Sequence, residues 1–115
     1  MTIARHHIGP RMSQIVIHGD TIYLAGQVAN DVTADIIGQT KQVLNKIDSL
    51  LDEVGSDKSK ILTAQIWLPN IGDFSKMNEV WDAWVMEGQT PARACIEARL
   101  AAPSYLVEIG VIAAL

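Results

Sequence analysis

The residues of this chain best suited to chemistry lie near its C-terminus. Every second residue from position 93 to 99 is charged or carries a thiol: Arg93, Cys95, Glu97 and Arg99. Because side chains alternate along a β-strand, these four are expected to share one face. A further carboxylate, Glu108, interrupts the apolar run over residues 106–112. An arginine, a thiol and a carboxylate are therefore expected close together.

Two interpretations of these charges follow from the residues alone. A buried charge is normally paired, so Arg93 with Glu108, or Arg99 with Glu97, can be structural ion pairs across a sheet. Alternatively, Arg93 lies in a cleft and holds a small carboxylic acid, because its planar guanidinium matches a carboxylate with two parallel hydrogen bonds. Glu108 then acts as a base or positions a water molecule.

Other reactive residue types show no pattern typical of a metal site or a nucleophile. Cys95 is interpreted as a small hydrophobic residue, since no histidine is near it in sequence. His6 and His7 are adjacent and point opposite ways on an extended segment, and His18 stands alone before a turn. No glycine-rich nucleotide loop or serine-hydrolase motif is present. We expect no metal and no cofactor.

The elements that must position these residues follow from hydrophobic periodicity. Runs rich in β-forming residues predict strands over residues 13–18, 21–28, 61–68, 92–100 and 105–115. An apolar stripe at spacings of three and four predicts a helix over 36–54, capped by Thr33 or Asp35 and ended by Gly55. A second helix is expected between a cap at Asp73 and a stop at Gly88. Its Trp81 and Trp84 are interpreted as core residues.

This order, ββαβαββ, is typical of an α+β fold with a mostly antiparallel sheet and both helices on one face. The last two strands are expected to form a hairpin around a turn at residues 101–104. Gly26, inside the second strand, indicates that another group approaches the backbone closely. The helices leave the other sheet face uncovered, so we expect it to pack against further subunits.

Size and charge restrict the function. The 115 residues suit one domain, 1–115, and the net charge of −4 with nine scattered Lys and Arg argues against nucleic-acid binding. No apolar stretch reaches the length of a membrane helix, so no membrane association is expected. The single cysteine excludes an internal disulfide and favours a reducing, cytoplasmic location.

The chain resembles a known family. Residues 89–100, QTPARACIEARL, resemble the C-terminal signature of the Rid family (RidA/YjgF type). Four further segments resemble family motifs in the same order: IGP at 8–10, LAGQV at 24–28, DFSKMN at 73–78 and VEI at 107–109. The resemblance covers nearly the whole chain. It implies a chorismate-mutase-like fold, a homotrimer built around a central barrel, and active clefts between subunits.

The resemblance also implies an activity that needs no metal or cofactor. Archetypal members are hydrolases that deaminate reactive enamines and imines, such as 2-aminoacrylate, to 2-keto acids and ammonia. Carried over by position, Arg93 holds the substrate carboxylate and Glu108 positions the attacking water. Cys95, Asn78 and Gly26 match other residues of the cleft.

Two positions depart from the archetype. Arg11 (or Met12, if this segment carries an extra residue) stands where archetypal members have a tyrosine, and Ala25 stands where they have a serine. Arg11 would add a second cation to the substrate site. The loss of two hydroxyl groups keeps open an alternative, a non-catalytic, regulatory protein that binds 2-keto acids or related carboxylates. A third interpretation, ribonuclease activity, conflicts with the acidic balance and the absence of a basic patch.

Overall fold

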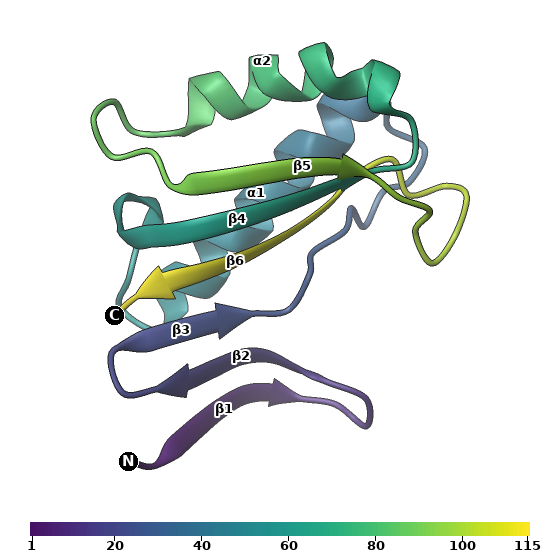
Figure 1. The fold of residues 1–115 in the computed structure, drawn as a ribbon. Helices are drawn as coiled ribbons and strands as arrows, with labels where there is room; N and C mark the ends of the chain where they lie inside the picture. Colours follow the sequence, from purple (N-terminus) through teal and green to yellow (C-terminus); the bar gives the residue numbers. More distant parts are fainter.

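One mixed sheet with two helices on a single face makes up the protein (Figure 1). The computed structural model describes all residues, 1–115. Its strands are β1 (Ile3–Ile8), β2 (Ser13–His18), β3 (Thr21–Leu24), β4 (Ile61–Leu68), β5 (Ala92–Glu97) and β6 (Glu108–Ala114). Its helices are α1 (Ile36–Glu53) and α2 (Phe74–Trp84), with short 3-10 turns η1 (Lys58–Lys60) and η2 (Ile71–Asp73).

The strands are arranged in the order β1-β2-β3-β6-β4-β5. All neighbours are antiparallel except β4 and β5, which run parallel. The predicted α+β class, with a mostly antiparallel sheet and two helices on one face, is therefore confirmed.

The N-terminal strand β1 was not expected from the sequence. It pairs with β2 in a single antiparallel register from Ile3 opposite His18 to Ile8 opposite Ser13. Nearly all its side chains are exposed, so it lacks the alternation of apolar and polar residues that marks a half-buried strand. His7, with a φ of 54°, directs its Nε2 to 2.8 Å from Oε1 of Glu53 and so joins β1 to α1.

The predicted C-terminal hairpin is wrong. The strands β5 and β6 are not neighbours, because β4 lies between them and pairs with both. Residues 98–107 carry the chain across the end of β4, as the long loop beside β5 in Figure 1 shows. Adjacent strands in sequence usually pair, but here the longer connection lets β6 enter the middle of the sheet.

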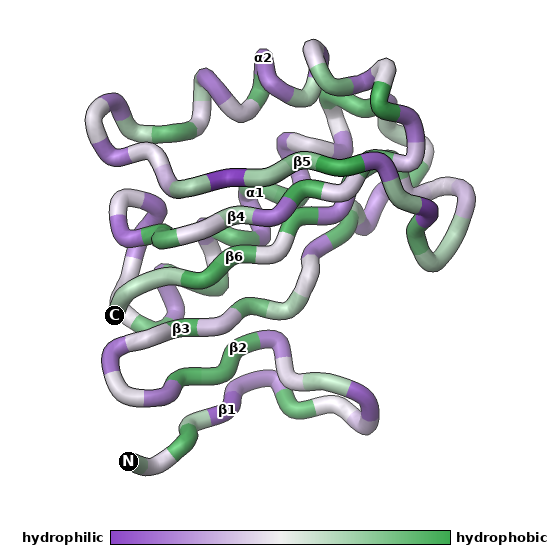
Figure 2. The backbone as a smooth tube through the Cα atoms, in the orientation of Figure 1, coloured by the Kyte–Doolittle hydropathy of each residue, from purple (hydrophilic) through white to green (hydrophobic).

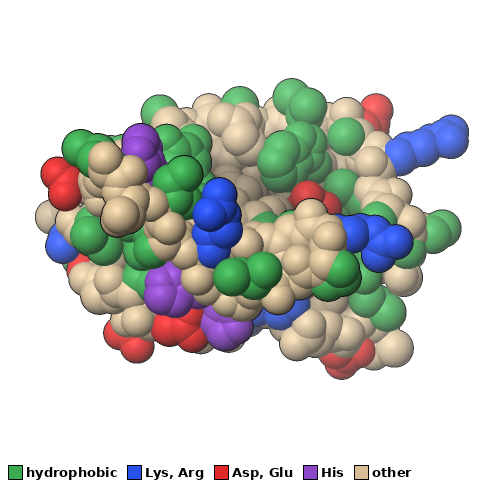
Figure 3. Space-filling view, turned by 90° about the horizontal axis from the view of Figure 1, so that it is seen from below, with side chains coloured by type: hydrophobic (Ala, Val, Ile, Leu, Met, Phe, Trp, Pro, Cys, Tyr) green, Lys and Arg blue, Asp and Glu red, His purple; other side chains and the backbone are tan.

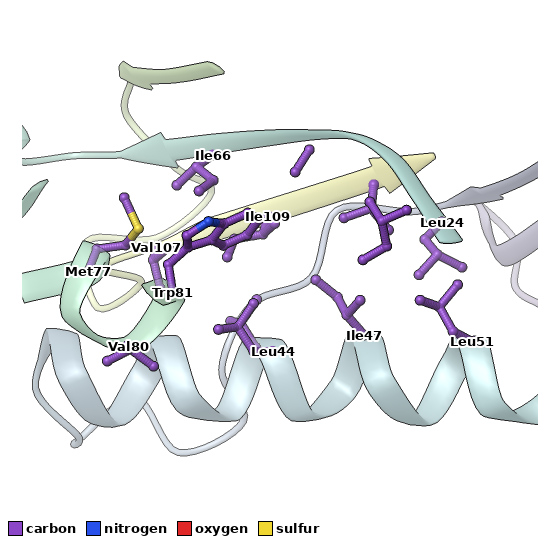
Figure 4. Close-up of a cluster of buried hydrophobic side chains, with 14 of the residues drawn as sticks. Leu24, Leu44, Ile47, Leu51, Ile66, Met77, Val80, Trp81, Val107 and Ile109 are labelled. Atoms are coloured by element: carbon purple, nitrogen blue, oxygen red, sulfur yellow. The ribbon is translucent and has the colours of Figure 1, made fainter. Parts of the chain in front are cut away.

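The core lies between the sheet and the helices. Fully buried side chains of α1, including Leu44, Ile47 and Leu51, face buried residues of β4 and β6 such as Ile66 and Ile109 (Figure 4). The hydropathy of the chain follows this arrangement, with hydrophobic stretches in β4 and β6 and a mixed pattern in β1 (Figure 2). Neither helix combines the length and the apolar character that a membrane span requires.

The helix ends partly match the prediction. Asp35 caps α1 by accepting a hydrogen bond from the Gly38 backbone N–H at 2.9 Å, and Gly55 follows the helix with a positive φ of 80°. Asp73 precedes α2 but makes no side-chain capping bond, and α2 stops at Trp84, before Gly88. Gly88 instead takes a positive φ of 78° in the following turn.

The sheet face away from the helices, here called the open face, is rich in apolar side chains. Tyr23 of β3 is 44 % exposed and Ile96 of β5 is 54 % exposed. Partly exposed Val16 and Ile112 flank Tyr23 in the strand register, and Trp67 pairs with Ile96. An apolar surface that crosses several strands indicates a binding interface, so the open face agrees with the expectation of further subunits.

Candidate functional site

Arg93 lies on the helix side of the sheet, at the β5 edge. The register pairs Arg93 with Ala64 of β4, whose side chain is fully buried beneath the helices. Since paired residues on neighbouring strands point to the same face, Arg93 points toward α2. Its Nη1 donates a hydrogen bond to Oδ1 of Asn78 on α2, at 2.7 Å. Arg93 and Asn78, which the resemblance assigns to one cleft, are thus in contact.

Two aromatic rings complete the surroundings of this guanidinium. The Cζ atom of Arg93 lies 5.7 Å from the ring centroid of Phe74 and 5.2 Å from that of Trp81. Both distances suit cation–π attraction, which orients the guanidinium plane without using its N–H groups. The molecule has one ion pair, between His7 and Glu53, and no carboxylate lies within 4.0 Å of Arg93. The donors not bonded to Asn78 are therefore available to an external carboxylate.

Phe74 and Trp81 were not predicted as site residues. Their positions relative to Asn78, four before and three after, place all three side chains on one face of α2. That spacing was readable in the sequence, but it also fits core packing, and Trp81 is indeed buried at 5 % exposure.

Cys95 follows on the same face and forms a neutral wall beside Arg93. It pairs with the buried Ile66 and packs against the hydrophobic core. Burial raises the pKa of the Cys95 thiol, and the positive charge of Arg93 offsets only part of this effect. The thiol is therefore protonated near neutral pH and is not an activated nucleophile.

Glu108 lies on the other face of the sheet. It pairs with Trp67 of β4, while the next residue, Ile109, is completely buried beneath the helices. Because side chains alternate along β6, Glu108 points to the open face. Arg93 and Glu108 are thus on opposite faces, and neither of the predicted structural ion pairs forms. Glu97 instead accepts a hydrogen bond from the Ile71 backbone N–H at 3.1 Å.

The close approach predicted at Gly26 is made by Glu108. A Cβ atom at Gly26 would lie 3.0 Å from Cδ of Glu108 and would overlap its Oε2. The φ of Gly26 is not positive, so the absence of a side chain serves proximity rather than backbone conformation. Gly26 and Glu108 therefore form one compact unit on the open face.

A small hollow of about 280 Å³ adjoins this unit. Glu108, Trp67 and Arg99 line it together with residues of the loop after β5. The sequence predicts Arg99 only as an ion-pair partner of Glu97, because the predicted hairpin does not take this loop across the end of β4. We call Arg93, Asn78, Cys95, Phe74 and Trp81 the arginine half, and Glu108, Gly26, Trp67 and Arg99 the glutamate half.

Arg11 is near neither Arg93 nor its strand. It lies in the exposed turn between β1 and β2, and β1 is the sheet edge opposite β5. Figure 3, viewed from the β1 side, shows basic side chains that are scattered and form no continuous stripe. No three His, Cys, Asp or Glu side chains come together closely enough to hold a metal ion. One protomer therefore carries two separated halves of the predicted site.

Comparison with known proteins gives the class to which this fold and these residues belong. The family model described as Endoribonuclease L-PSP matches residues 5–115. The chain is 45 % identical over 114 residues to the RutC family protein YoaB of Escherichia coli K12, with 99 % of each chain covered. It is 46 % identical to a RutC family protein of Haemophilus influenzae, with 98 % of each chain covered.

Solved structures agree. An uncharacterized protein from Pseudomonas aeruginosa superimposes with a TM-score of 0.96 at 43 % identity, covering 98 % of both chains. A YjgF family member from Neisseria meningitidis has the same TM-score at 46 % identity, covering 99 % of this chain and 95 % of its own. A Rid family protein from Yersinia pestis reaches 0.85 at 34 % identity, covering 94 % and 90 %. The chain belongs to the Rid (YjgF) family.

The contact between Gly26 and Glu108 predicts a specific coupling. Gly26→Ala forces Glu108 to move and is expected to lower the free energy of unfolding by about 1–3 kcal/mol, the usual cost of overpacking. Glu108→Ala removes the overlap, so the second substitution should restore most of that loss. Urea unfolding at one fixed protein concentration measures both. Gly110→Ala is the matched control, since its Cβ would meet the Trp67 ring edge at 3.4 Å and Gly26 Cα at 3.9 Å, which are ordinary van der Waals contacts. Additive effects of the two substitutions would contradict the contact.

The environment of Cys95 predicts its reactivity with pH. The rate of Cys95 alkylation by iodoacetamide should rise with pH. The apparent pKa of this rise should be higher in the folded protein than in the same protein in urea, because burial disfavours the thiolate. Arg93→Met should raise this pKa further, since the nearby positive charge lowers it. Rates measured by mass spectrometry across a pH series test both statements. A lower pKa in the folded protein would refute the neutral-wall description.

Proposed function

We propose that the protein hydrolyses small 2-imino acids and their enamine tautomers, such as 2-aminoacrylate, to 2-keto acids and ammonia. The observation that carries the proposal is Arg93, a guanidinium that is oriented by Asn78 and two aromatic rings yet has no carboxylate partner within 4.0 Å. An oriented, unpaired guanidinium is suited to bind a carboxylate with two parallel hydrogen bonds. Membership of the Rid family supports the same substrate class.

The complete site is proposed to form between protomers. Arg93 and Glu108 point to opposite faces of one sheet, so no small ligand reaches both within one chain. Covering the apolar open face with a second copy would place the glutamate half of one protomer against the arginine half of the next. Three copies in a ring close such a head-to-tail contact, which fits the homotrimer implied by the family resemblance.

The chemistry then requires mainly positioning. Arg93 holds the carboxylate, and Cys95 contributes an uncharged wall. The Glu108 carboxylate, from the neighbouring protomer, orients a water and accepts its proton as the water oxygen bonds to the imine carbon. Glu108 returns this proton to the nitrogen, and the C–N bond then breaks as the hydroxyl of the addition product loses its proton, which releases ammonia and leaves the 2-keto acid. Arg11 and Ala25 replace two hydroxyl-bearing residues of the archetype, so Glu108 is the group proposed to deliver the proton.

A non-catalytic carboxylate-binding protein is the alternative that the same Arg93 geometry supports. The family model's description as an endoribonuclease offers a further candidate, but the scattered basic side chains and the net charge of −4 provide no phosphate-binding stripe. We place the protein in the cytoplasm, because the partly buried Cys95 is a free thiol and suits a reducing compartment.

A coupled assay tests the proposed activity. Threonine dehydratase generates 2-iminobutyrate from threonine, and the protein should accelerate its disappearance. Arg93→Ala is expected to lower kcat/KM by about 10- to 100-fold, the loss of one or two charge-assisted hydrogen bonds. Lys76→Ala, which removes an exposed cation from the same helix as Asn78, is the matched control and should leave the rate unchanged.

The outcomes separate the candidates. No acceleration together with calorimetric binding of 2-ketobutyrate that depends on Arg93 would favour the binding protein over the enzyme. Equal acceleration by Arg93→Ala and the unmodified protein would refute the proposed site. Cleavage of single-stranded RNA by highly purified protein would favour the ribonuclease.

A further inference from the structure

A second hollow lies between the two helices, away from the residues discussed so far. We call it the interhelical groove. It measures about 490 Å³, within the range of about 300–1,000 Å³ typical of small-molecule sites. Leu44 of α1 and Val80 and Trp84 of α2 supply apolar lining, and Lys41, Lys58 and Glu79 supply its charges. No residue of the arginine half or the glutamate half lines it.

Trp84 is held in a fixed orientation within this groove. Its indole N–H donates a hydrogen bond to Oδ2 of Asp48 on α1, at 2.9 Å. Its ring lies 5.4 Å from the ring of Trp81, at an interplanar angle of 50°. Trp81 is buried, whereas Trp84 remains partly exposed and faces the groove. The prediction that both tryptophans belong to the core is therefore right for Trp81 and incomplete for Trp84.

The charges of the groove are unbalanced. Lys58 Nζ lies 5.3 Å from the Trp84 ring centroid, and no carboxylate lies within 4.0 Å of Lys41 or Lys58. Lys58 also lines a neighbouring hollow with Asp48, Asp52 and Asp57, of which Asp48 accepts a hydrogen bond from Trp84 and Asp57 accepts one from Ser59. Glu79 is the only carboxylate that lines the groove. The lining of the groove itself thus carries two ammonium groups and one carboxylate, in a protein of net charge −4.

We propose that the interhelical groove binds a small aromatic carboxylate. A planar ring can stack on the exposed part of Trp84 and bury apolar surface against Leu44 and Val80. The carboxylate then meets the ammonium groups of Lys41 and Lys58 and supplies the counter-charge that neither has within 4.0 Å. No residue of the groove belongs to the open face or to either half of the proposed active site, so the proposed subunit contacts do not use it. This site is independent of the proposed hydrolysis at Arg93.

Nuclear magnetic resonance of the full-length protein tests the proposal with 2-naphthoate as the probe and the uncharged 2-naphthylmethanol as its matched control. The three tryptophans give three indole N–H signals, and the spectrum of Trp84→Phe assigns that of Trp84. Naphthoate should shift the Trp84 signal saturably and bind more tightly than the alcohol. Lys41→Met with Lys58→Met should weaken naphthoate binding by about fivefold, the effect of two exposed charge contacts, and leave the alcohol unaffected.

Two further variants complete the design. Lys60→Met with Lys76→Met removes two exposed lysines outside the groove and should leave naphthoate binding unchanged. Arg93→Ala should also leave it unchanged, which separates this site from the proposed active site. The proposal is overturned if the Trp84 signal does not shift saturably, if the alcohol binds as tightly as naphthoate, or if binding is lost in Arg93→Ala but persists in the Lys41 and Lys58 double variant.

Discussion

The parallel pairing of β5 with β4 determines where the charged side chains of this protein lie. It places Arg93 opposite the buried Ala64 and therefore beneath α2, where Asn78 and two aromatic rings hold the guanidinium. It also allows β6 to occupy the other side of β4, with Glu108 on the open face. The same pairing that positions the arginine thus separates it from the glutamate. A site that needs both residues requires a second protomer.

The fold could be predicted from the sequence wherever one face of an element is buried. The stripe of α1 and the strands β2 and β4 follow from periodicity, because burial enforces the pattern. The sequence leaves the cap of α1 open between Thr33 and Asp35, and the structure shows that it is Asp35. The edge strand β1 could not be found in this way, since nearly all its side chains are exposed and its pairing depends on backbone hydrogen bonds to β2. The hairpin prediction failed because periodicity describes single strands and does not reveal which strands become neighbours.

The candidate site was predicted in parts. The sequence indicates that a group lies close to Gly26, and the structure identifies that group as Glu108. The resemblance assigns Asn78 and Arg93 to one cleft, and the structure adds the hydrogen bond between them. Phe74 and Trp81 were not predicted as site residues, because an aromatic residue on a helix face fits core packing equally well. The separation of the two halves could not be derived, because it depends on the position of β4 between β5 and β6. The apolar open face, with Tyr23 and Ile96 exposed, gives the physical reason for a partner there.

Mixed trimers test the proposed trimer and its proposed shared site most directly. Arg93→Ala and Glu108→Gln protomers with different tags are expressed together, and trimers that carry both tags are purified. In a head-to-tail ring each mixed trimer contains one contact that joins an intact Arg93 to an intact Glu108, so about one third of the unmodified activity should return. Imine hydrolysis and binding of 2-ketobutyrate provide the readouts. Mixed trimers no more active than either single variant would contradict a site built from two protomers.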